Sequence, residues 1–300
     1  MHNPLAHFVP RCLRELLSIP STQASEWEAQ LAYWLQVPVG ELPNIRMGPR
    51  YHYRPFSITK RDGRERRILA PSPALKQLQH RLLHNYLYTL PVHPAATAFQ
   101  RGCSIMDNAR RHAGQTLIAT LDLVDFFEST TADRVRRFFV RQGWRGKELA
   151  VLMRLCVYRD GLPQGAPTSP CLSNLVNYDL DEQMASLAQR ADAIYTRYGD
   201  DLTFSWRNDR VPAYFEPKLR GILTDAGYAI QPRKAWHIQH INAGPQITGL
   251  VLGHDGRIQI PRRLYWEAFK LRWRLWWRPD PHTAARLQGY ESFFNTPGLR

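Results

Sequence analysis

The chain has 300 residues, of which 44% are hydrophobic, and its 40 Lys and Arg against 26 Asp and Glu give a net charge of +14. This length can bury a large core in one domain or in two to three subdomains, and the basic balance favours a polyanionic partner such as nucleic acid. No run is apolar enough to cross a bilayer, no signal-peptide core is present, and the four cysteines lack metal-ligand spacing, which argues against a membrane partner and predicts a cytoplasmic protein.

Helical and strand patterns alternate in the first third of the chain. Apolar residues at helical spacing predict helices within residues 1–50 and again over residues 73–90. Between these helices, Asp62-Gly63 separates two alternating runs. This pattern predicts a β-hairpin within residues 51–71, with Lys60 and several arginines on it.

The middle of the chain contains a predicted buried strand and a loop. The strand-like run at residues 116–121 ends at Asp122. A loop dense in Gly and Pro follows at residues 159–170 and leads into a helical stretch from Leu172 to Leu187. Gly165 would let a ligand approach the backbone closely, although in isolation the loop is more simply structural.

Two adjacent carboxylates stand at a tight turn in Tyr198-Gly199-Asp200-Asp201. The β-rich runs at residues 193–197 and 202–205 predict a hairpin with this pair at its tip, although an acidic pair alone usually marks only a turn. Two like charges so close repel each other unless a cation neutralises them, and Asp122 is a candidate third carboxylate. Three oxygen donors suit a hard cation such as Mg²⁺, with Mn²⁺ as a substitute.

A predicted helix near the end of the sequence combines basic and aromatic side chains. Lys270, Arg274 and Arg278 gather on one face, and we expect them to contact the phosphates of a nucleic acid without reading its sequence. An aromatic stripe lies on the adjoining face and is more typical of core packing than of a nucleic-acid platform. Its members are Trp266, Phe269, Trp273 and Trp276.

The order of these features resembles the fingers and palm of reverse transcriptases. A basic hairpin is followed by Asp122 with an aromatic residue five positions on, then by Leu162-Pro163-Gln164-Gly165 and by Tyr198-Gly199-Asp200-Asp201. The resemblance implies an α+β, right-hand polymerase architecture with fingers, a palm built on an antiparallel sheet, and a small helical thumb. The implied boundaries are an N-terminal helical extension at 1–50, fingers at 51–115, a palm at 116–255 with 131–160 as an interleaved helical fingers segment, and a thumb at 256–300.

Two further motifs resemble those of bacterial retron reverse transcriptases. Asn108-Ala109-Arg110-Arg111-His112 matches an Asn-Ala-x-x-His element, and Ile247-Thr248-Gly249 is close to a Val-Thr-Gly element. Asn108 and His112 would share one helix face, where such a pair is usually structural. The resemblance covers about residues 53–294, and its departures are Ile247 in place of Val and Gly199 where Ala is usual.

The resemblance also implies roles for individual residues. Asp122, Asp200 and Asp201, with the backbone of Leu123, would hold two Mg²⁺ ions for catalysis. Nucleotide binding would fall to Lys60, Arg66 (with Arg67 as its rival), Asp125, Phe126, Phe127, Gln164, Gly165 and Lys234. Among these, Lys60 and Arg66 would clamp the triphosphate, Asp125 would meet it through its amide, and Lys234 would lie near the leaving group. Phe127 would be a steric gate against ribose, although a core aromatic is its simpler interpretation. RNA or DNA would contact Asn108, His112, Tyr198, Thr248, Gly249, Lys270, Arg274 and Arg278.

Retron membership would imply a cognate non-coding RNA that serves as both template and primer. Synthesis from deoxynucleoside triphosphates would start at an internal 2′-hydroxyl and give RNA-linked single-stranded DNA, with an effector protein as partner in defence against phage. Three alternatives stay open. The first is another reverse transcriptase class (CRISPR-associated, diversity-generating or intron-related), and the second is an RNA-dependent RNA polymerase, against which the bulky Phe127 argues. The third is a non-catalytic RNA-binding scaffold, although all three carboxylates are present.

Overall fold

The computed structural model describes residues 26–48, 50–59, 63, 65–232 and 236–296. Two compact units make up the chain. The first comprises residues 1–90 and 131–169, and the second comprises residues 91–130 and 170–300. No helix in these described ranges is long and apolar enough to span a membrane.

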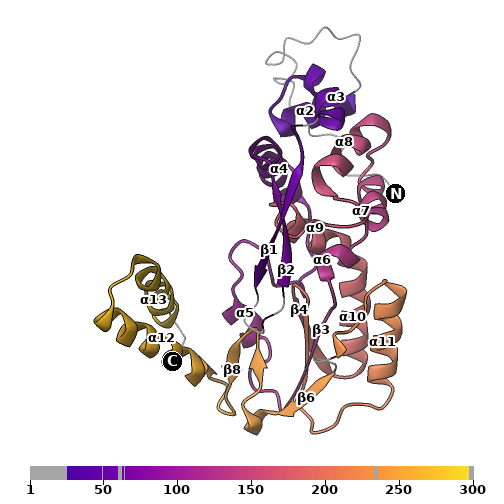
Figure 1. Ribbon diagram of the computed structural model, residues 1–300. Coiled ribbons are helices and arrows are strands. Elements are labelled where there is room, and N and C mark those ends of the chain that lie inside the picture. Colours follow the sequence, from indigo (N-terminus) through magenta and orange to yellow (C-terminus); the bar gives the residue numbers. More distant parts are fainter. Residues whose placement is uncertain (1–25, 49, 60–62, 64, 233–235, 297–300) are drawn as a thin grey trace. The chain divides into compact units, whose positions relative to one another are not determined.

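The first unit combines a two-stranded hairpin with short helices (Figure 1). Strands β1 (Tyr53–Thr59) and β2 (Glu65–Pro71) pair in antiparallel register, as the alternating sequence predicts. The other elements are helices α2 (Glu26–Leu35), α3 (Leu42–Met47), α4 (Pro73–Asn85), α7 (Ala132–Arg141) and α8 (Gly146–Cys156), with 3-10 turns η1 (Val39–Glu41) and η2 (Leu87–Thr89).

Helix α4 begins where the sequence provides both a cap and a favourable first residue. The Ser72 hydroxyl accepts a hydrogen bond from the Leu75 amide at 3.4 Å, and Pro73 occupies the first turn, where its missing N–H costs nothing. The helix buries an apolar face that includes Leu75, Leu78 and Leu82. Its packing supports the hairpin that precedes it.

The second unit is built on a four-stranded antiparallel sheet in the order β4-β5-β3-β6. The strands are β3 (Leu117–Asp122), β4 (Ala193–Tyr198), β5 (Asp201–Trp206) and β6 (His237–His240). A small sheet contains β7 (Gln246–Ile247), β8 (Leu250–Leu252) and β9 (Ile258–Gln259). The helices are α5 (Ile105–Arg110), α6 (Phe126–Ser129), α9 (Ser169–Val176), α10 (Tyr178–Arg190), α11 (Phe215–Asp225), α12 (Arg262–Trp277) and α13 (Pro281–Phe294), with the 3-10 turn η4 (Ile241–Ala243).

The register of β3 decides which face of the sheet carries Asp122. Successive strand side chains point to opposite faces. Leu117, Ala119 and Leu121 join the hydrophobic core shared with α10 and α11, whereas Ile118 joins a second core with α5 and the small sheet. Asp122 has the parity of Ile118, so it belongs to the face opposite to α10 and α11.

The predicted helical stretch from Leu172 to Leu187 is confirmed, and the structure divides it into two helices. The break falls at Asn177, between α9 and α10. The Asn177 amide donates to the carbonyl of Ser173 at 2.8 Å and to the Tyr228 hydroxyl at 2.9 Å. A side chain that bonds its own preceding turn competes with helix continuation.

Candidate active site

Asp122 and Asp201 are direct cross-strand neighbours. Asp122 ends β3, Asp201 begins β5, and the two residues are paired in register. The Leu123 amide donates to the carbonyl of Asp200 at 3.0 Å, and on the other side of β3 the Gln231 amide donates to the carbonyl of Asp122 at 2.8 Å. Pairing on both sides holds the backbone of Asp122 in place and brings the three predicted carboxylates to one end of the sheet.

This set of donors fits a hard divalent cation. Carboxylate oxygens are the ligands that Mg²⁺ prefers, and like charges placed directly opposite each other destabilise a sheet unless they are neutralised. Asp200 is exposed and the other two carboxylates are half-buried, so solvent reaches the set. Among the described residues, no three Asp, Glu, His or Cys side chains converge closely enough to hold an ion. The backbone register, rather than side-chain convergence, groups these carboxylates.

The segment from Tyr198 to Asp201, which we call the catalytic turn after its predicted role, is a hairpin turn with a two-residue loop. Tyr198 pairs with Asp201, which leaves Gly199 and Asp200 as the loop. Gly199 has a φ of 67°, a conformation that favours glycine at the first loop position. Burial and the charge of Asp201 both raise the pKa of Tyr198 above its ordinary value, so the phenol lies within electrostatic reach of this carboxylate.

Arg197 supports this turn from within the core, and sequence reasoning missed it. Its Nη1 donates to the carbonyl of Gly199 at 3.2 Å, and its guanidinium lies 5.5 Å from the centre of the Phe126 ring. Burial alone would lower the pKa of Arg197, but the charge and hydrogen bonds of Asp181 on α10 raise it above the ordinary value. A charged residue inside an otherwise apolar strand was the signal for this role.

The Asp125 to Phe127 segment follows β3 and begins α6. Asp125 is exposed and adopts the left-handed conformation, with a φ of 43° and a ψ of 48°. The Phe126 side chain is buried and stacks on Tyr228 at 5.6 Å, so only its backbone can meet a nucleotide. Phe127 is half-buried, and its ring lies 6.1 Å from that of Phe99. The accessible ring of Phe127 is what a steric gate requires.

In the first unit, the loop that contains Gln164 and Gly165 lies against β2, the strand that carries Arg66. The Leu69 amide donates to the carbonyl of Gln164 at 2.8 Å, and a Cβ on Gly165 would lie 3.0 Å from Cγ2 of Ile68. Because alternate residues of β2 share a face, Arg66 lies on the face of Ile68, which contacts the loop, and Arg67 lies on the other. This geometry favours Arg66 over Arg67 as the arginine predicted to bind the nucleotide. Lys60 and Lys234 lie outside the described residues.

Asn108 and His112 are buried, and the burial contradicts direct contact of their side chains with RNA. The two ring nitrogens of His112 form hydrogen bonds with the hydroxyls of Ser205 at 2.7 Å and Thr196 at 2.8 Å. The side-chain carbonyl of Asn108 accepts a hydrogen bond from the Thr97 hydroxyl at 2.8 Å. Burial, with the charge of Arg111, lowers the pKa of His112 to about 3, so the imidazole is neutral. The motif anchors its segment to the four-stranded sheet through β4 and β5.

The expectation that Asn108 and His112 share one helix face was also wrong. Helix α5 ends at Arg110, two residues before His112. The amide of His112 donates to the carbonyl of Ala109 in a tighter turn, at 3.0 Å. This turn, rather than a further helical turn, carries the imidazole.

Thr248 and Gly249 form the tight loop between β7 and β8. Both have positive φ, 49° and 85°, as a type I′ hairpin loop requires. The Thr248 hydroxyl donates to the carbonyl of Ile105 at 3.3 Å, which ties this loop to the start of α5. Gly249 is exposed, and contact of this motif with nucleic acid stays a prediction.

The basic stripe of α12 is exposed as predicted. In the described part of the chain, no acidic side chain pairs with Lys270, Arg274 or Arg278, whereas Arg272 bonds Glu291 at 2.7 Å. The three unpaired cations form a positive surface on the helix and at its end. Such a surface is suited to phosphate contacts.

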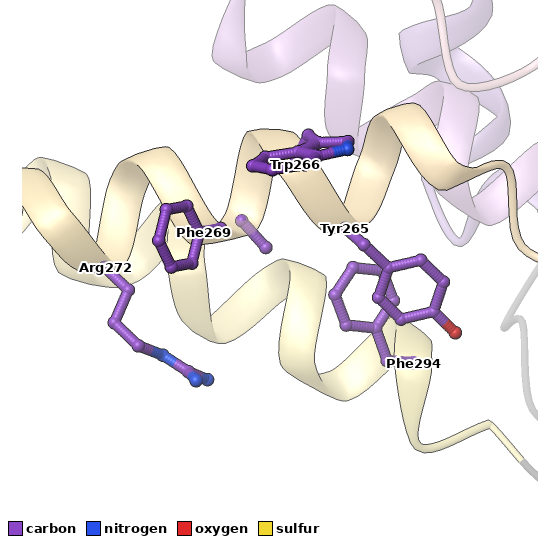
Figure 2. Close-up of a pocket in the computed structure, with 6 residues that line it drawn as sticks. Tyr265, Trp266, Phe269, Arg272 and Phe294 are labelled. Carbon is purple, nitrogen blue, oxygen red and sulfur yellow. The ribbon is translucent and has the colours of Figure 1, made fainter.

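The expectation that the aromatic stripe of α12 is core was wrong. Trp266 is 63% exposed and Trp276 is 72% exposed. The neighbouring stripe of Ala268 and Leu271 packs instead against Leu287 of α13. Figure 2 shows a pocket of α12 and α13 in which the rings of Tyr265 and Phe294 stack. Its lining is Tyr265, Trp266, Ala268, Phe269, Arg272 and Phe294.

Comparisons with known proteins agree with this geometry. The reverse transcriptase (RNA-dependent DNA polymerase) family profile matches residues 58–243. The retron Ec86 reverse transcriptase of Escherichia coli is 36% identical over 219 residues, which cover 72% of this chain and 68% of that protein. The retron Ec83 reverse transcriptase of the same organism is 33% identical, covering 73% of this chain and 74% of that protein. The retron Mx162 reverse transcriptase of Myxococcus xanthus is 35% identical over 70% of this chain, which spans only half of that protein's length.

A solved structure shares the fold. Telomerase from Candida albicans, determined in complex with a fragment of telomeric RNA, superposes with a TM-score of 0.52 at 10% identity, covering 77% of this chain and 52% of that one. Likeness at this identity establishes the fold alone, and it confirms the predicted α+β reverse transcriptase architecture. The family profile and the retron relatives add the family. This chain belongs to the reverse transcriptase family and, within it, to the retron reverse transcriptases.

Proposed function

We propose that this chain is an RNA-directed DNA polymerase that copies a structured non-coding RNA. The observation that carries the proposal is the in-register pairing of Asp122 with Asp201 beside the catalytic turn. It groups carboxylates at a sheet end in a chain whose relatives are named retron reverse transcriptases. The net charge of +14 supports a nucleic-acid substrate.

Reverse transcriptases use divalent metal ions, and we propose two Mg²⁺ ions, replaceable by Mn²⁺. Asp122, Asp200 and Asp201, with the carbonyl of Leu123, would hold them. Bound ions would lower the pKa of the primer hydroxyl and neutralise charge on the triphosphate. The backbone pairing of Asp122 and the Arg197 contact to Gly199 would keep the carboxylates oriented for this task.

The proposal also includes the residues that would bind and select the nucleotide. Lys60 and Arg66 would supply positive charge to the triphosphate, and Lys234 would act near the leaving group. The amide of Asp125 would meet a phosphate oxygen. Gln164 and Gly165 would contribute to the nucleotide pocket, with Phe126 acting through its backbone and Phe127 excluding a ribose 2′-hydroxyl by its bulk.

The RNA is proposed to act as both template and primer. Synthesis would begin at an internal 2′-hydroxyl and would leave single-stranded DNA joined to RNA. Tyr198, Thr248 and Gly249, together with the exposed stripe of Lys270, Arg274 and Arg278, would contact the RNA or its DNA product. The proposal includes a cytoplasmic setting, an effector protein as partner, and a role in defence against phage.

Sequencing of the nucleic acid that co-purifies with the chain tests this proposal. We expect DNA covalently joined to one structured RNA, absent from a variant with Asp200→Asn and Asp201→Asn. Purified protein with that RNA should incorporate deoxynucleotides in preference to ribonucleotides. Copying with ribonucleotides alone would indicate an RNA polymerase, and DNA synthesis that persists in the double variant would overturn the metal assignment.

Loss of synthesis with retained phage defence would favour an RNA-binding scaffold. A product DNA that is primed elsewhere than on its own RNA would favour another reverse transcriptase class. Both measurements use the same wild-type protein and double variant, so a folding defect is recognised by comparing their thermal melting.

A further inference from the structure

Phe99 is an aromatic residue of the second unit that the functions above do not use. The segment before it, residues 95–98, runs along β4. There the Thr97 amide donates to the carbonyl of Arg197 at 2.8 Å. The carbonyl immediately preceding Phe99 accepts a hydrogen bond from Asn174 at 2.7 Å. The backbone that leads into Phe99 is therefore held on two sides.

The backbone of Phe99 is strained, and its ring contributes little to the core. Its φ is 61°, in a region that bulky residues seldom adopt. The side chain of Gln100 donates to the carbonyl of Ala96 and so closes the turn around Phe99. The ring nevertheless remains 41% exposed. Strain kept for an exposed aromatic side chain is not explained by packing, and such strain is concentrated at functional sites.

The ring of Phe99 touches both the proposed gate and the catalytic turn. Its centre lies 6.1 Å from that of Phe127 and 6.4 Å from that of Tyr198, distances at which aromatic rings attract each other. Its Cζ atom lies 3.4 Å from where a Cβ on Gly199 would be. Phe99 thus connects the ring that would meet the sugar to the turn that carries Asp200.

The two ring neighbours of Phe127 in the described structure differ in how firmly they are held. Phe126 is buried, stacks on Tyr228, and lies under the guanidinium of Arg197. Phe99 is the exposed neighbour. Removing the Phe99 ring would leave one flank of Phe127 without support, and a ring that tilts into that space would admit a 2′-hydroxyl.

We propose that Phe99 is a positioning residue for sugar selection, which holds the ring of Phe127 in the orientation that excludes ribonucleotides. This inference rests on the proposed function, in which Phe127 is the steric gate. It extends that function by assigning selectivity to a pair of rings. Phe99 itself touches neither the substrate nor the metal ions in this role.

The test is a double-mutant cycle on the full chain with its co-purified RNA. The ratio of kcat/KM for dCTP to that for CTP is measured for wild type, Phe99→Ala, Phe127→Ala and the double variant. Phe99→Ala should lower this ratio roughly two- to tenfold, the loss expected for one aromatic pair. Phe127→Ala should lower it further, and the double variant should match Phe127→Ala, because residues that act as one unit are not additive.

Two further variants separate positioning from a general defect. Phe99→Tyr keeps the ring and should keep the ratio. Tyr214→Ala removes another exposed ring of the same unit, one that bonds the carbonyl of Arg190, and should also leave the ratio unchanged. Thermal melting of every variant confirms that it is folded.

The inference would be overturned by an unchanged ratio in Phe99→Ala when Phe127→Ala lowers it. An additive double variant would overturn it as well, because Phe99 would then act independently of Phe127. If neither variant changes the ratio, then Phe127 is not a steric gate and Phe99 has no positioning role, although the proposed DNA synthesis is not contradicted. If the wild type makes no DNA at all, it is the proposed function that fails.

Discussion

Arg197 and Asp181 form a fully buried ion pair with two hydrogen bonds. Nε of Arg197 donates to Oδ1 of Asp181 at 2.8 Å, and Nη2 donates to Oδ2 at 2.6 Å. The Tyr195 hydroxyl also donates to Oδ1 at 2.8 Å. Because the remaining guanidinium nitrogen reaches the carbonyl of Gly199, this pair connects α10 to the catalytic turn.

Replacing Asp181 by Asn should destabilise the protein strongly. The substitution leaves the buried charge of Arg197 without a counter-ion, and breaking a buried pair in this way costs about 3–5 kcal/mol. Urea unfolding of wild type and Asp181→Asn measures this cost. Arg220→Ala, which breaks an exposed pair with Glu216, is the control and should cost about 1 kcal/mol or less. Equal effects of the two changes would contradict the prediction.

Replacing Gly165 by Ala should disrupt the loop beside β2. Its φ of 125° is strained for any residue with a side chain, and the new Cβ would lie 2.8 Å from the carbonyl oxygen of Leu69. The strain and the weakened bond between Leu69 and Gln164 together predict a loss of about 2–4 kcal/mol. Gly63→Ala is the matched control, because Gly63 also has positive φ but has open space around it. Equal melting temperatures for the two variants would contradict this prediction.

Strand β3 and the catalytic turn were predictable because their signals are local. Asp122 follows an apolar run, and the acidic pair of the catalytic turn lies between two β-rich runs. The burial of His112 was not predictable, because its partners Thr196 and Ser205 are 84 and 93 residues away in sequence. Tertiary packing, which local sequence does not reveal, therefore determines that the His112 side chain bonds the sheet rather than RNA.

Helix α12 shows the same limit of sequence reasoning. It has two apolar stripes, one aromatic and one aliphatic, and periodicity alone does not say which of them packs. Leu271 and Ala268 face Leu287 of α13, which leaves Trp273 and Trp276 exposed. Which of the two stripes is buried depends on the packing of α13.

Stability should fall as the pH is lowered, because His112 is neutral in the folded chain. Its folded pKa of about 3 lies below the ordinary histidine pKa of 6.5, so between these values the unfolded state binds more protons. Stability contributed by the neutral ring is complete above about pH 6.5 and is lost as the pH falls toward 3. At pH 5 the loss is about 2 kcal/mol.

Urea unfolding at pH 7.5 and pH 5 measures this dependence. The matched variant is His112→Gln, which offers a donor and an acceptor but does not titrate. It should be less stable than wild type at pH 7.5 and should lose less stability on acidification. If both proteins lose the same amount, other groups carry the pH dependence.

The unpaired cations of α12 should determine part of the salt dependence of RNA binding. Each phosphate contact contributes about 0.7–0.9 to the slope of log K against log salt. Replacing Lys270, Arg274 and Arg278 together by Ala should therefore reduce the slope by about 2–3. Binding to the co-purified RNA is measured by titration at several salt concentrations.

The control for this surface is Arg272→Ala. Arg272 carries the same charge on the same helix, but its guanidinium bonds Glu291 at 2.7 Å, so it is less available to a phosphate. We expect a smaller change in slope for this variant than the average change for each of the three unpaired cations. An unrelated structured RNA should show the same loss in slope, because phosphate contacts carry no sequence information. A slope that is unchanged in the triple variant would place the phosphate contacts elsewhere on the chain.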